Sequence, residues 1–231
     1  MKNIWGRRIP YNVLGIIGCF LLFITCKDKE FNTINLQIDI VQDSQTIYLS
    51  TFAEPPQFAI WLEGVEDNEF LPVFVTHRSA KQDWEGKPRV PVAVPTWFDR
   101  SGEQSNADAY SGATPRDSTF TITTRIPEGS IWDCYIEVNL AGDFNEYFPE
   151  FNKKTLVEDE FFCGQPALIY KARVVAKDGY QITPELIGQS VVQDKKSVIH
   201  PVDNGVTTAR NVFKRISIEA TDFYQPSETL Q

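Results

Sequence analysis

One short segment of the chain has residue types that suit the covalent attachment of a phosphate-linked group. The run DAYSGAT, from Asp108 to Thr114, ends in a threonine that follows three small residues. A threonine hydroxyl can accept a phosphoryl group, because such transfer depends on positioning and metal ions more than on an unusual nucleophile. In this interpretation Thr114 is the acceptor, Ser111, Gly112 and Ala113 shape the loop, and Asp108 orients it. The alternative is an ordinary turn, with Asp108 and Ser111 as capping residues and Gly112 at a positive φ.

No other constellation in the sequence predicts catalysis. A hydrolase needs a base beside a nucleophile, and neither His77 nor His200 lies in such a setting. The Cys and His residues are too few and too dispersed for a structural zinc site, and the chain has no Gly-rich phosphate loop. We therefore predict no catalytic residue and no metal site.

Segments with period-two alternation must position the Asp108–Thr114 loop. In TINLQIDI (33–40) and IWDCYIEVNL (131–140), apolar and polar residues alternate, which is typical of half-buried antiparallel strands. Turn signals at Glu66-Asp67-Asn68 and Asp178-Gly179 predict hairpins. Many short strands and few helices predict an all-β fold, an antiparallel β-sandwich of the immunoglobulin-like kind, with a long irregular loop from Ser79 to Arg116.

The first 25 residues have the features of a targeting segment rather than of a folded element. Lys2, Arg7 and Arg8 precede an apolar run from Val13 to Thr25 that ends at Cys26. This pattern resembles a bacterial lipoprotein signal, in which Cys26 becomes the lipidated first residue; the alternative is an uncleaved signal anchor. We expect a signal peptide (1–25), a lipidated tether (26–31), one domain (32–225) and a tail (226–231), anchored to a bacterial (outer) membrane and facing the periplasm or the cell surface.

Charge and cysteine content restrict the possible partners and crosslinks. Removal of residues 1–25 takes away three basic residues and no acid, so the formal charge changes from −9 to −12. An acidic chain without a basic patch is not expected to bind nucleic acid. Cys134 and Cys163 either form a disulfide, which an exported protein can keep, or remain buried thiols.

Two groups of aromatic residues are each open to two interpretations. Phe144, Tyr147, Phe148 and Phe151 form either a surface for a partner or a glycan or a loop packed on the sheet edge. Trp97 and Tyr110 either stack on a bound ring or belong to the core.

The form Asp-x-x-Ser-Gly-Ala-Thr resembles the acceptor motif of proteins that carry FMN covalently on a threonine. The flavin subunits of sodium-pumping NADH:quinone reductase and of the Rnf complex have this motif, and a separate flavin transferase attaches FMN from FAD there. Five specified residues at fixed spacing should occur by chance in a chain of this length only about once in a thousand. The resemblance implies that Thr114 is the attachment site.

A second resemblance covers most of the mature chain. FAIWLEG, VPTWFDRSG, DAYSGATP, YIEVNLAGDFNEYF, GQPALIY and GVTTARNVFKRISI follow one another as in a family of exported bacterial proteins described as a predicted periplasmic domain of unknown function. Members of this family are thought to include flavinylated partners of membrane redox proteins. The chain departs from the quinone-reductase subunits at Pro115-Arg116-Asp117, where Pro115 fits the exported family better.

We therefore expect an electron carrier rather than an enzyme, because the chemistry would belong to the flavin. Its partners would be a flavin transferase, a membrane redox protein and, through the anchor, the membrane. The alternative is a structural or binding lipoprotein without a cofactor.

Metabolic labelling with a fatty-acid analogue tests the anchor. The native chain and Cys19→Ala should both be labelled, whereas Cys26→Ala should not, because the lipid requires the Cys26 sulfur. Label that survives Cys26→Ala would contradict lipidation at this residue.

Overall fold

The structure is a computed structural model, and it describes residues 32–81, 83–84, 87–88, 93–102, 109–154, 157–158, 163–194 and 196–222. The chain separates into two compact units, Met1–Glu30 and Phe31–Gln231. The expected signal peptide, Cys26, Asp108 and the tail 226–231 lie outside the described residues.

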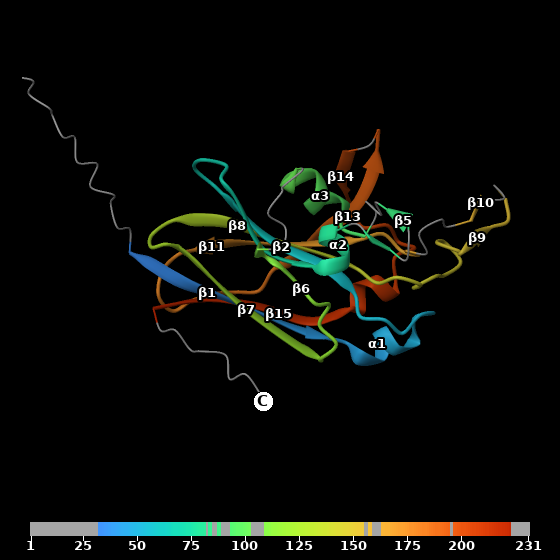
Figure 1. Cartoon of the computed structure of the whole chain (residues 1–231), viewed down its shortest axis with the longest axis horizontal. Coiled ribbons are helices and arrows are strands. Elements are labelled where there is room, and N and C mark those ends of the chain that lie inside the picture. The colour runs from blue at the N-terminus through green and yellow to red at the C-terminus, as the bar shows by residue number, and fades with distance from the viewer. Residues whose placement is uncertain are drawn as a thin grey trace, which may run out of the picture. The chain divides into compact units, whose positions relative to one another are not determined.

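Strands make up most of the regular structure, so the prediction of an all-β fold is confirmed (Figure 1). In the part of the chain that the structure describes, the elements in chain order are β1 (Thr33–Gln42), α1 (Ser44–Leu49), β2 (Gln57–Gly64), β3 (Phe70–Thr76), α2 (His77–Lys81), β4 (Asp83–Trp84), β5 (Lys87–Pro88), α3 (Pro95–Ser101), β6 (Ser111–Gly112), β7 (Thr119–Pro127), β8 (Ile131–Asn139), β9 (Phe151–Asn152), β10 (Val157–Glu158), β11 (Leu168–Val175), β12 (Tyr180–Ile182), β13 (Glu185–Gln193), β14 (Lys196–His200), η2 (Thr208–Asn211) and β15 (Phe213–Thr221).

Two sheets contain most of these strands. One has four strands in the order β12-β15-β1-β7, and the other has seven in the order β14-β13-β11-β8-β2-β3-β6. Neighbouring strands are antiparallel, except that β6 runs parallel to β3. In Figure 1, β1, β7 and β15 form one layer and β2, β8 and β11 another.

The two sheets share one hydrophobic core. The alternation predicted for β1 is present, since Ile34, Leu36, Ile38 and Ile40 are fully buried while the residues between them are partly exposed. From the other sheet, Phe58 of β2 contacts aromatic rings on both sheets, with centroid distances of 5.1 Å to Phe74, 5.2 Å to Phe120 and 5.6 Å to Phe213. Aromatic pairs at such distances add to the free energy gained from apolar burial.

The prediction that β8 is half-buried is wrong for its second half. Glu137 and Asn139, on the face opposite Ile136 and Val138, are also buried. The cause is α3, which packs against β2, β3, β13 and β14 on that face of the seven-stranded sheet. A second hydrophobic cluster fills this layer and contains Ala59, Trp61, Val75, Val94 and Trp97.

One of the two predicted hairpins is present. Glu66-Asp67-Asn68 lies in the turn between β2 and β3, which pair directly, and Asn68 has a φ of 58°. The turn at Asp178-Gly179 also forms, but the strands on either side of it enter different sheets, so that prediction is wrong. Gly179 N donates to Ala220 O at 2.9 Å, which draws β12 to β15 rather than to β11.

Of the two alternatives for Cys134 and Cys163, the structure has the buried thiols, because it forms no disulfide between them. Cys134 lies five residues before Asn139, the end of β8, a distance of about 16 Å along a strand. Cys163 precedes Gly164, which packs against Asp143 beyond the strand end. A disulfide needs Cα atoms within about 7 Å, so the bridge would require the strand to leave its sheet.

Thiol titration of the mature domain checks this arrangement. Burial raises the pKa of the Cys134 thiol to about 12, so it should not react with a thiol reagent in the native protein at pH 8. In denaturant without reductant, both Cys134 and Cys163 should react. No reaction of either thiol in denaturant, with recovery after reduction, would show that the bridge exists.

Candidate functional site

The segment that contains Ser111, Gly112, Ala113 and Thr114 lies at the edge of the seven-stranded sheet. Ser111 and Gly112 form β6, which pairs with Val75 and Thr76 of β3. Val75 N also donates to Tyr110 O at 3.2 Å. Backbone pairing therefore determines where the small residues lie, and Thr114 follows two residues after the pairing ends.

Gly112 is explained by close packing rather than by its backbone angle. A Cβ at this position would lie 2.7 Å from Phe74 Cε2, and Gly112 is not among the residues with positive φ. Phe74 is held in the core by Phe58 and by Phe120, whose ring centroid is 4.7 Å away. Any larger residue at 112 would separate β6 from β3, so the turn interpretation of this glycine is wrong.

A buried glutamine contacts the hydroxyl of Thr114. Gln57 Nε2 donates to Thr114 Oγ1 at 3.3 Å, and Gln57 Oε1 accepts from Thr76 Oγ1 at 2.7 Å. The bond from Thr76 orients the amide, so its NH2 group faces Thr114. Thr114 is partly exposed, and in the described residues its hydroxyl has no acceptor. The Thr114 proton is therefore available to an external base.

A second buried glutamine holds the residues that follow Thr114. Gln42, the last residue of β1, is 3% exposed. Its Nε2 donates to Pro115 O at 3.3 Å and to Asp117 O at 3.0 Å, and its backbone N donates to Ser118 O at 2.7 Å. Gln42 and Gln57 thus fix the loop from two sides.

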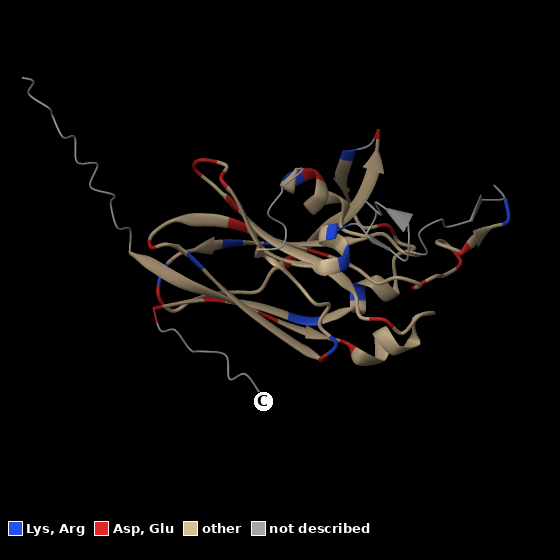
Figure 2. Cartoon of the chain, in the orientation of Figure 1, with Lys and Arg blue, Asp and Glu red and all other residues tan. Residues whose placement is uncertain are grey.

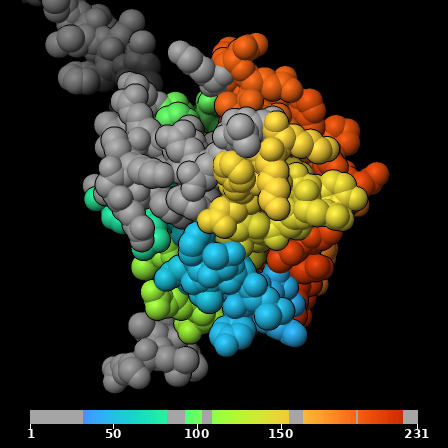
Figure 3. Space-filling model, turned by 90° about the vertical axis from the view of Figure 1, so that its right-hand side faces the viewer, coloured from blue at the N-terminus to red at the C-terminus, as the bar shows by residue number. Residues whose placement is uncertain are grey.

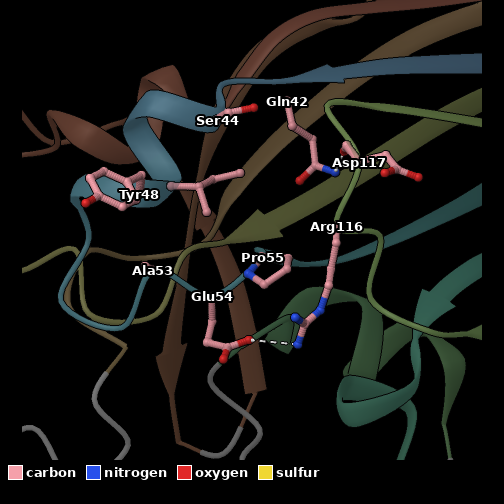
Figure 4. A pocket seen from close by; sticks show the side chains of 9 residues that line it. Gln42, Ser44, Tyr48, Ala53, Glu54, Pro55, Arg116 and Asp117 are labelled. Atoms are coloured by element: carbon pink, nitrogen blue, oxygen red, sulfur yellow. Dashed lines mark hydrogen bonds and ion pairs between the residues drawn. The ribbon is translucent and has the colours of Figure 1, made fainter.

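A cavity of about 280 Å³ adjoins this loop (Figure 4). It is lined by Gln42, Ser44, Ile47, Tyr48, Ala53, Glu54, Pro55, Arg116 and Asp117. Arg116 Nη2 and Glu54 Oε2, 3.9 Å apart, lie across it. Helix α1 forms one wall, and Asp43 caps this helix through bonds from Gln45 N (2.9 Å) and Thr46 N (3.1 Å). The backbone hydrogen bond from Thr46 lowers the pKa of Asp43, which keeps the cap ionised.

The structure distinguishes the two groups of aromatic residues, the pair Trp97 and Tyr110 and the loop aromatics between residues 144 and 151. Trp97 is 3% exposed and packs in the second cluster, with its ring centroid 6.4 Å from that of Tyr110, so Trp97 is a core residue. Of the loop aromatics, Phe148 packs against the main core, whereas Tyr147 and Phe151 are exposed by 64% and 47%.

A buried carboxylate on β8 holds α3 in place. Glu137 is fully buried, and it accepts from Thr96 N at 3.0 Å, from Trp97 N at 2.7 Å and from the Ser190 hydroxyl. Val94, at the N-cap of α3, makes no side-chain cap bond. The carboxylate of Glu137, on the neighbouring sheet, instead accepts hydrogen bonds from the N–H groups in the first turn of the helix. Burial raises the pKa of Glu137 to about 7. Sequence reasoning missed this residue, although the Pro-Thr sequence at the start of α3 signals a helix N-terminus.

Charged side chains do not form a basic surface in the described part of the chain. Figure 2 shows Lys and Arg distributed over several elements. Asp133 lies 2.9 Å from both Lys171 and Arg173. Partial burial acts to raise the pKa of Asp133, but the hydrogen bonds from Arg173 and Lys171 lower it by more, so the net pKa is below its ordinary value.

Among the described residues, no three His, Cys, Asp or Glu side chains are grouped as metal ligands would be. Within the same ranges, no helix combines the length and the apolar character that crossing a membrane requires.

Comparison of the chain with models of protein families found no match, and neither the curated protein sequences nor the solved structures gave one. The resemblance to flavin acceptor proteins therefore rests on the residues of the chain itself.

The pH dependence of unfolding tests the role of Glu137. Because its folded-state pKa is raised above the ordinary 4.5, the folded protein retains a proton that the unfolded chain loses between about pH 4.5 and 7. The associated stability is complete below pH 4.5 and is lost as pH rises through 7.

Glu137→Gln should lower the free energy of unfolding at pH 5 by about 1–3 kcal/mol, because the Gln NH2 group faces a backbone N–H. The difference from the native protein should narrow by pH 8, as urea titrations at both pH values would show. If the difference in free energy of unfolding between the native protein and Glu137→Gln widened as pH rises, this would contradict a raised pKa of Glu137. Glu128→Gln, at an exposed residue, is the control.

Proposed function

We propose that the chain is a lipid-anchored, extracytoplasmic protein that carries FMN covalently on Thr114 and serves as an electron carrier. The observation that supports this most directly is the setting of Thr114 Oγ1. It is partly exposed, it accepts a hydrogen bond from the buried Gln57, and its residue is two positions before Arg116, which lines a cavity. In the proposed transfer, Thr114 Oγ1 bonds to the phosphorus on the FMN side of FAD, the pyrophosphate P–O bond breaks and AMP leaves, while the Thr114 proton passes to a base of the transferase. A fixed acceptor with an available proton suits this step.

The residues around Thr114 fit the attached group. Gly112 lets β6 approach β3, which keeps the loop narrow where a transferase must close around it. Arg116 follows Thr114 by two residues and is 81% exposed, so its guanidinium can turn toward a phosphate. When bound, FMN would supply the redox chemistry, and the chain would supply its position and surroundings.

The location of Thr114 also favours a carrier. β7 pairs with β1 so that Pro127 lies opposite Thr33 and Thr119 lies opposite Val41. The Thr114 loop, which leads into β7, is therefore at the end of β1 opposite to Asn32, where the described domain begins. Eight residue steps along a strand span about 27 Å. The segment that leads from Cys26 therefore joins the described domain at the end opposite to the Thr114 loop.

The proposed partners follow from this arrangement. They are a flavin transferase during loading, a membrane redox protein during electron transfer, and the bacterial (outer) membrane through Cys26. A formal charge of −12 after removal of residues 1–25 disfavours nucleic acid as a partner.

We further propose that the two sheets form an immunoglobulin-like sandwich, which their shared core supports. Strands of the two sheets crossing at about 90° in an experimental structure would contradict it.

A specific observation favours the alternative of a binding lipoprotein without cofactor. Tyr48, Leu49 and Phe52, on and after α1, are exposed by 76%, 70% and 44%. Figure 3 shows this segment (cyan) beside the segment that contains Tyr147 and Phe151 (yellow). Exposed aromatic residues on adjoining segments are typical of a surface that binds a protein or a glycan.

Co-expression with an active flavin transferase, with export, separates the two functions. The native chain should keep flavin fluorescence in a denaturing gel, because a phosphoester survives denaturation, and the flavin should be found on the tryptic peptide that contains Thr114. Thr114→Ala should abolish the fluorescence, Thr114→Ser should retain it, and Asp108→Ala should reduce it.

The matched control is Thr119→Ala, which removes an exposed hydroxyl five residues away and should not change the labelling. If the native chain stays unlabelled beside a transferase that labels a control substrate, the flavin proposal is wrong and the binding lipoprotein takes its place.

A further inference from the structure

Strand β7 is an unprotected edge of the four-stranded sheet. It is the last strand of that sheet and pairs with β1 along its whole length, without a bulge (Figure 1). A long, regular edge strand presents a row of unpaired N–H and C=O groups to any other strand, so proteins usually shorten, cover or charge such edges. In β7 the one proline, Pro127, is the last residue, and the one charged residue, Arg125, is exposed near the same end.

The other edges of the two main sheets are protected in the usual ways. β6 has two residues and β12 has three. β14 has five residues, and α3 covers it, with Ser197 N donating to the Asp99 side chain. In the part of the chain that the structure describes, β7 is therefore the one long edge that remains open.

The direction of each peptide group along β7 follows from the bonds just outside the strand. Ser118 O accepts from Gln42 N at 2.7 Å, and Glu128 N donates to Asn32 O at 2.8 Å. Because successive residues of a regular strand point their N–H and C=O groups to opposite sides, even-numbered residues face β1 and odd-numbered residues face outward. The outward-facing residues are Thr119, Thr121, Thr123, Arg125 and Pro127. No described residue bonds to their backbone groups.

The core-facing side chains of β7 are incompletely covered as well. Phe120 and Ile122 pack against the main core but remain partly exposed. Their partners on β1, Ile40 and Ile38, are only 1% and 0% exposed. A further strand beside β7 would bury the rest of both side chains, and burial of apolar surface stabilises association.

We propose that two copies of the chain associate through β7, in an antiparallel register centred on Ile122, so that their four-stranded sheets become one continuous sheet. Thr121 then lies opposite Thr123 of the second copy, and Thr119 lies opposite Arg125. All four outward N–H groups of each strand donate across the interface, while Pro127, which has no N–H, stays outside the ladder. The same surface is used by both copies, as in most dimers of identical chains.

The charges beside the strand favour a second copy as the occupant of this edge. Asp117 and Arg125 are both exposed, and neither forms an ion pair with another described residue. In the proposed register, Arg125 lies diagonally across from Asp117 of the second copy, on the same face of the sheet. Diagonal neighbours on antiparallel strands are about 7–8 Å apart, within reach of a long side chain. Symmetry makes this contact twice.

The pairing also changes the surroundings of the Thr114 loop. Because the two β7 strands are antiparallel, Thr119 of one copy lies beside the end of the second copy's β7 that is near Arg125. That end of β7 pairs with the beginning of β1, at Thr33. The Thr114 loop of each copy is therefore at the end of the doubled sheet where β1 of the other copy begins.

Cysteine cross-linking of the exported full chain tests the register. Ile122→Cys places a thiol opposite its own copy, so mild oxidation should give a covalent dimer on a non-reducing gel. Thr124→Cys is the matched control, because this residue is also partly buried on the same face of β7. Its copy would lie four residues along the strand, about 13 Å away, which exceeds the reach of a disulfide. The native chain, whose Cys134 and Cys163 are buried, should not cross-link.

Sedimentation of the full chain in detergent tests the backbone pairing. The native chain should form a dimer, and Thr123→Pro should raise its dissociation constant about tenfold, because two N–H donors are lost at the interface. An edge strand accepts a proline where the N–H faces outward, so each copy should still fold. Thr123→Val keeps the N–H group and should leave the dissociation constant unchanged.

A charge exchange tests the same interface without a proline. Arg125→Glu should raise the dissociation constant about fivefold through repulsion by Asp117, and Asp117→Arg combined with Arg125→Glu should restore the native value. A native chain that sediments as a monomer at every concentration would overturn the proposal. A dimer that neither Thr123→Pro nor Arg125→Glu weakens would do so too, as would equal cross-linking of Ile122→Cys and Thr124→Cys.

Discussion

The constraint on which this structure depends is that two central strands are buried on both faces, β2 along most of its length and β8 in its second half. β2 and β8 are neighbours in the middle of the seven-stranded sheet, with the main core on one side and α3 on the other. Three polar residues on them, Gln57, Glu137 and Asn139, are therefore almost completely buried. Polar groups in such a place must find hydrogen-bond partners within the protein. Gln57 finds them in Thr76 and Thr114, and Glu137 finds them in the first turn of α3. The Nδ2 group of Asn139 donates to Gln165 O, whereas its Oδ1 stays unpaired.

This constraint explains which parts of the fold could be predicted from the sequence. β1 has water on one side and the core on the other, so its alternation indicates both the strand and its buried face. In β8 the same alternation exists, but the polar face is buried as well, because a seven-residue helix covers it. Helix α3 is too short to show a helical periodicity in the sequence. It also lies within the segment from Ser79 to Arg116, which the sequence predicts to be an irregular loop. Sequence reasoning therefore found the strands and missed the layer on top of them.

The residues of the candidate site could also be predicted from the sequence only in part. Thr114 stands out in the sequence because small residues precede it and because its spacing from Asp108 resembles a known acceptor motif. Gln42 and Gln57 do not stand out, since a glutamine at a strand end is ordinary, and they lie 73 and 57 residues from their partners Pro115 and Thr114. Only the three-dimensional register brings them to the loop. The turn at Asp178-Gly179 fails for a similar reason, because the choice of partner strand is a long-range property that local turn chemistry does not contain.

The two glutamines differ in how completely their side-chain amides are hydrogen-bonded. Both hold the Thr114 loop, and both are buried. The amide of Gln57 has a partner at each end, so its interactions are complete within the protein. Gln42 makes two bonds with its nitrogen and none with its oxygen. A leucine at this position would remove the unpaired acceptor, but it would also leave the carbonyl oxygens of Pro115 and Asp117 without their donor, at a cost in folding free energy. The loop after Thr114 therefore depends on the donating end of the Gln42 amide, as Thr114 itself depends on the donating end of Gln57.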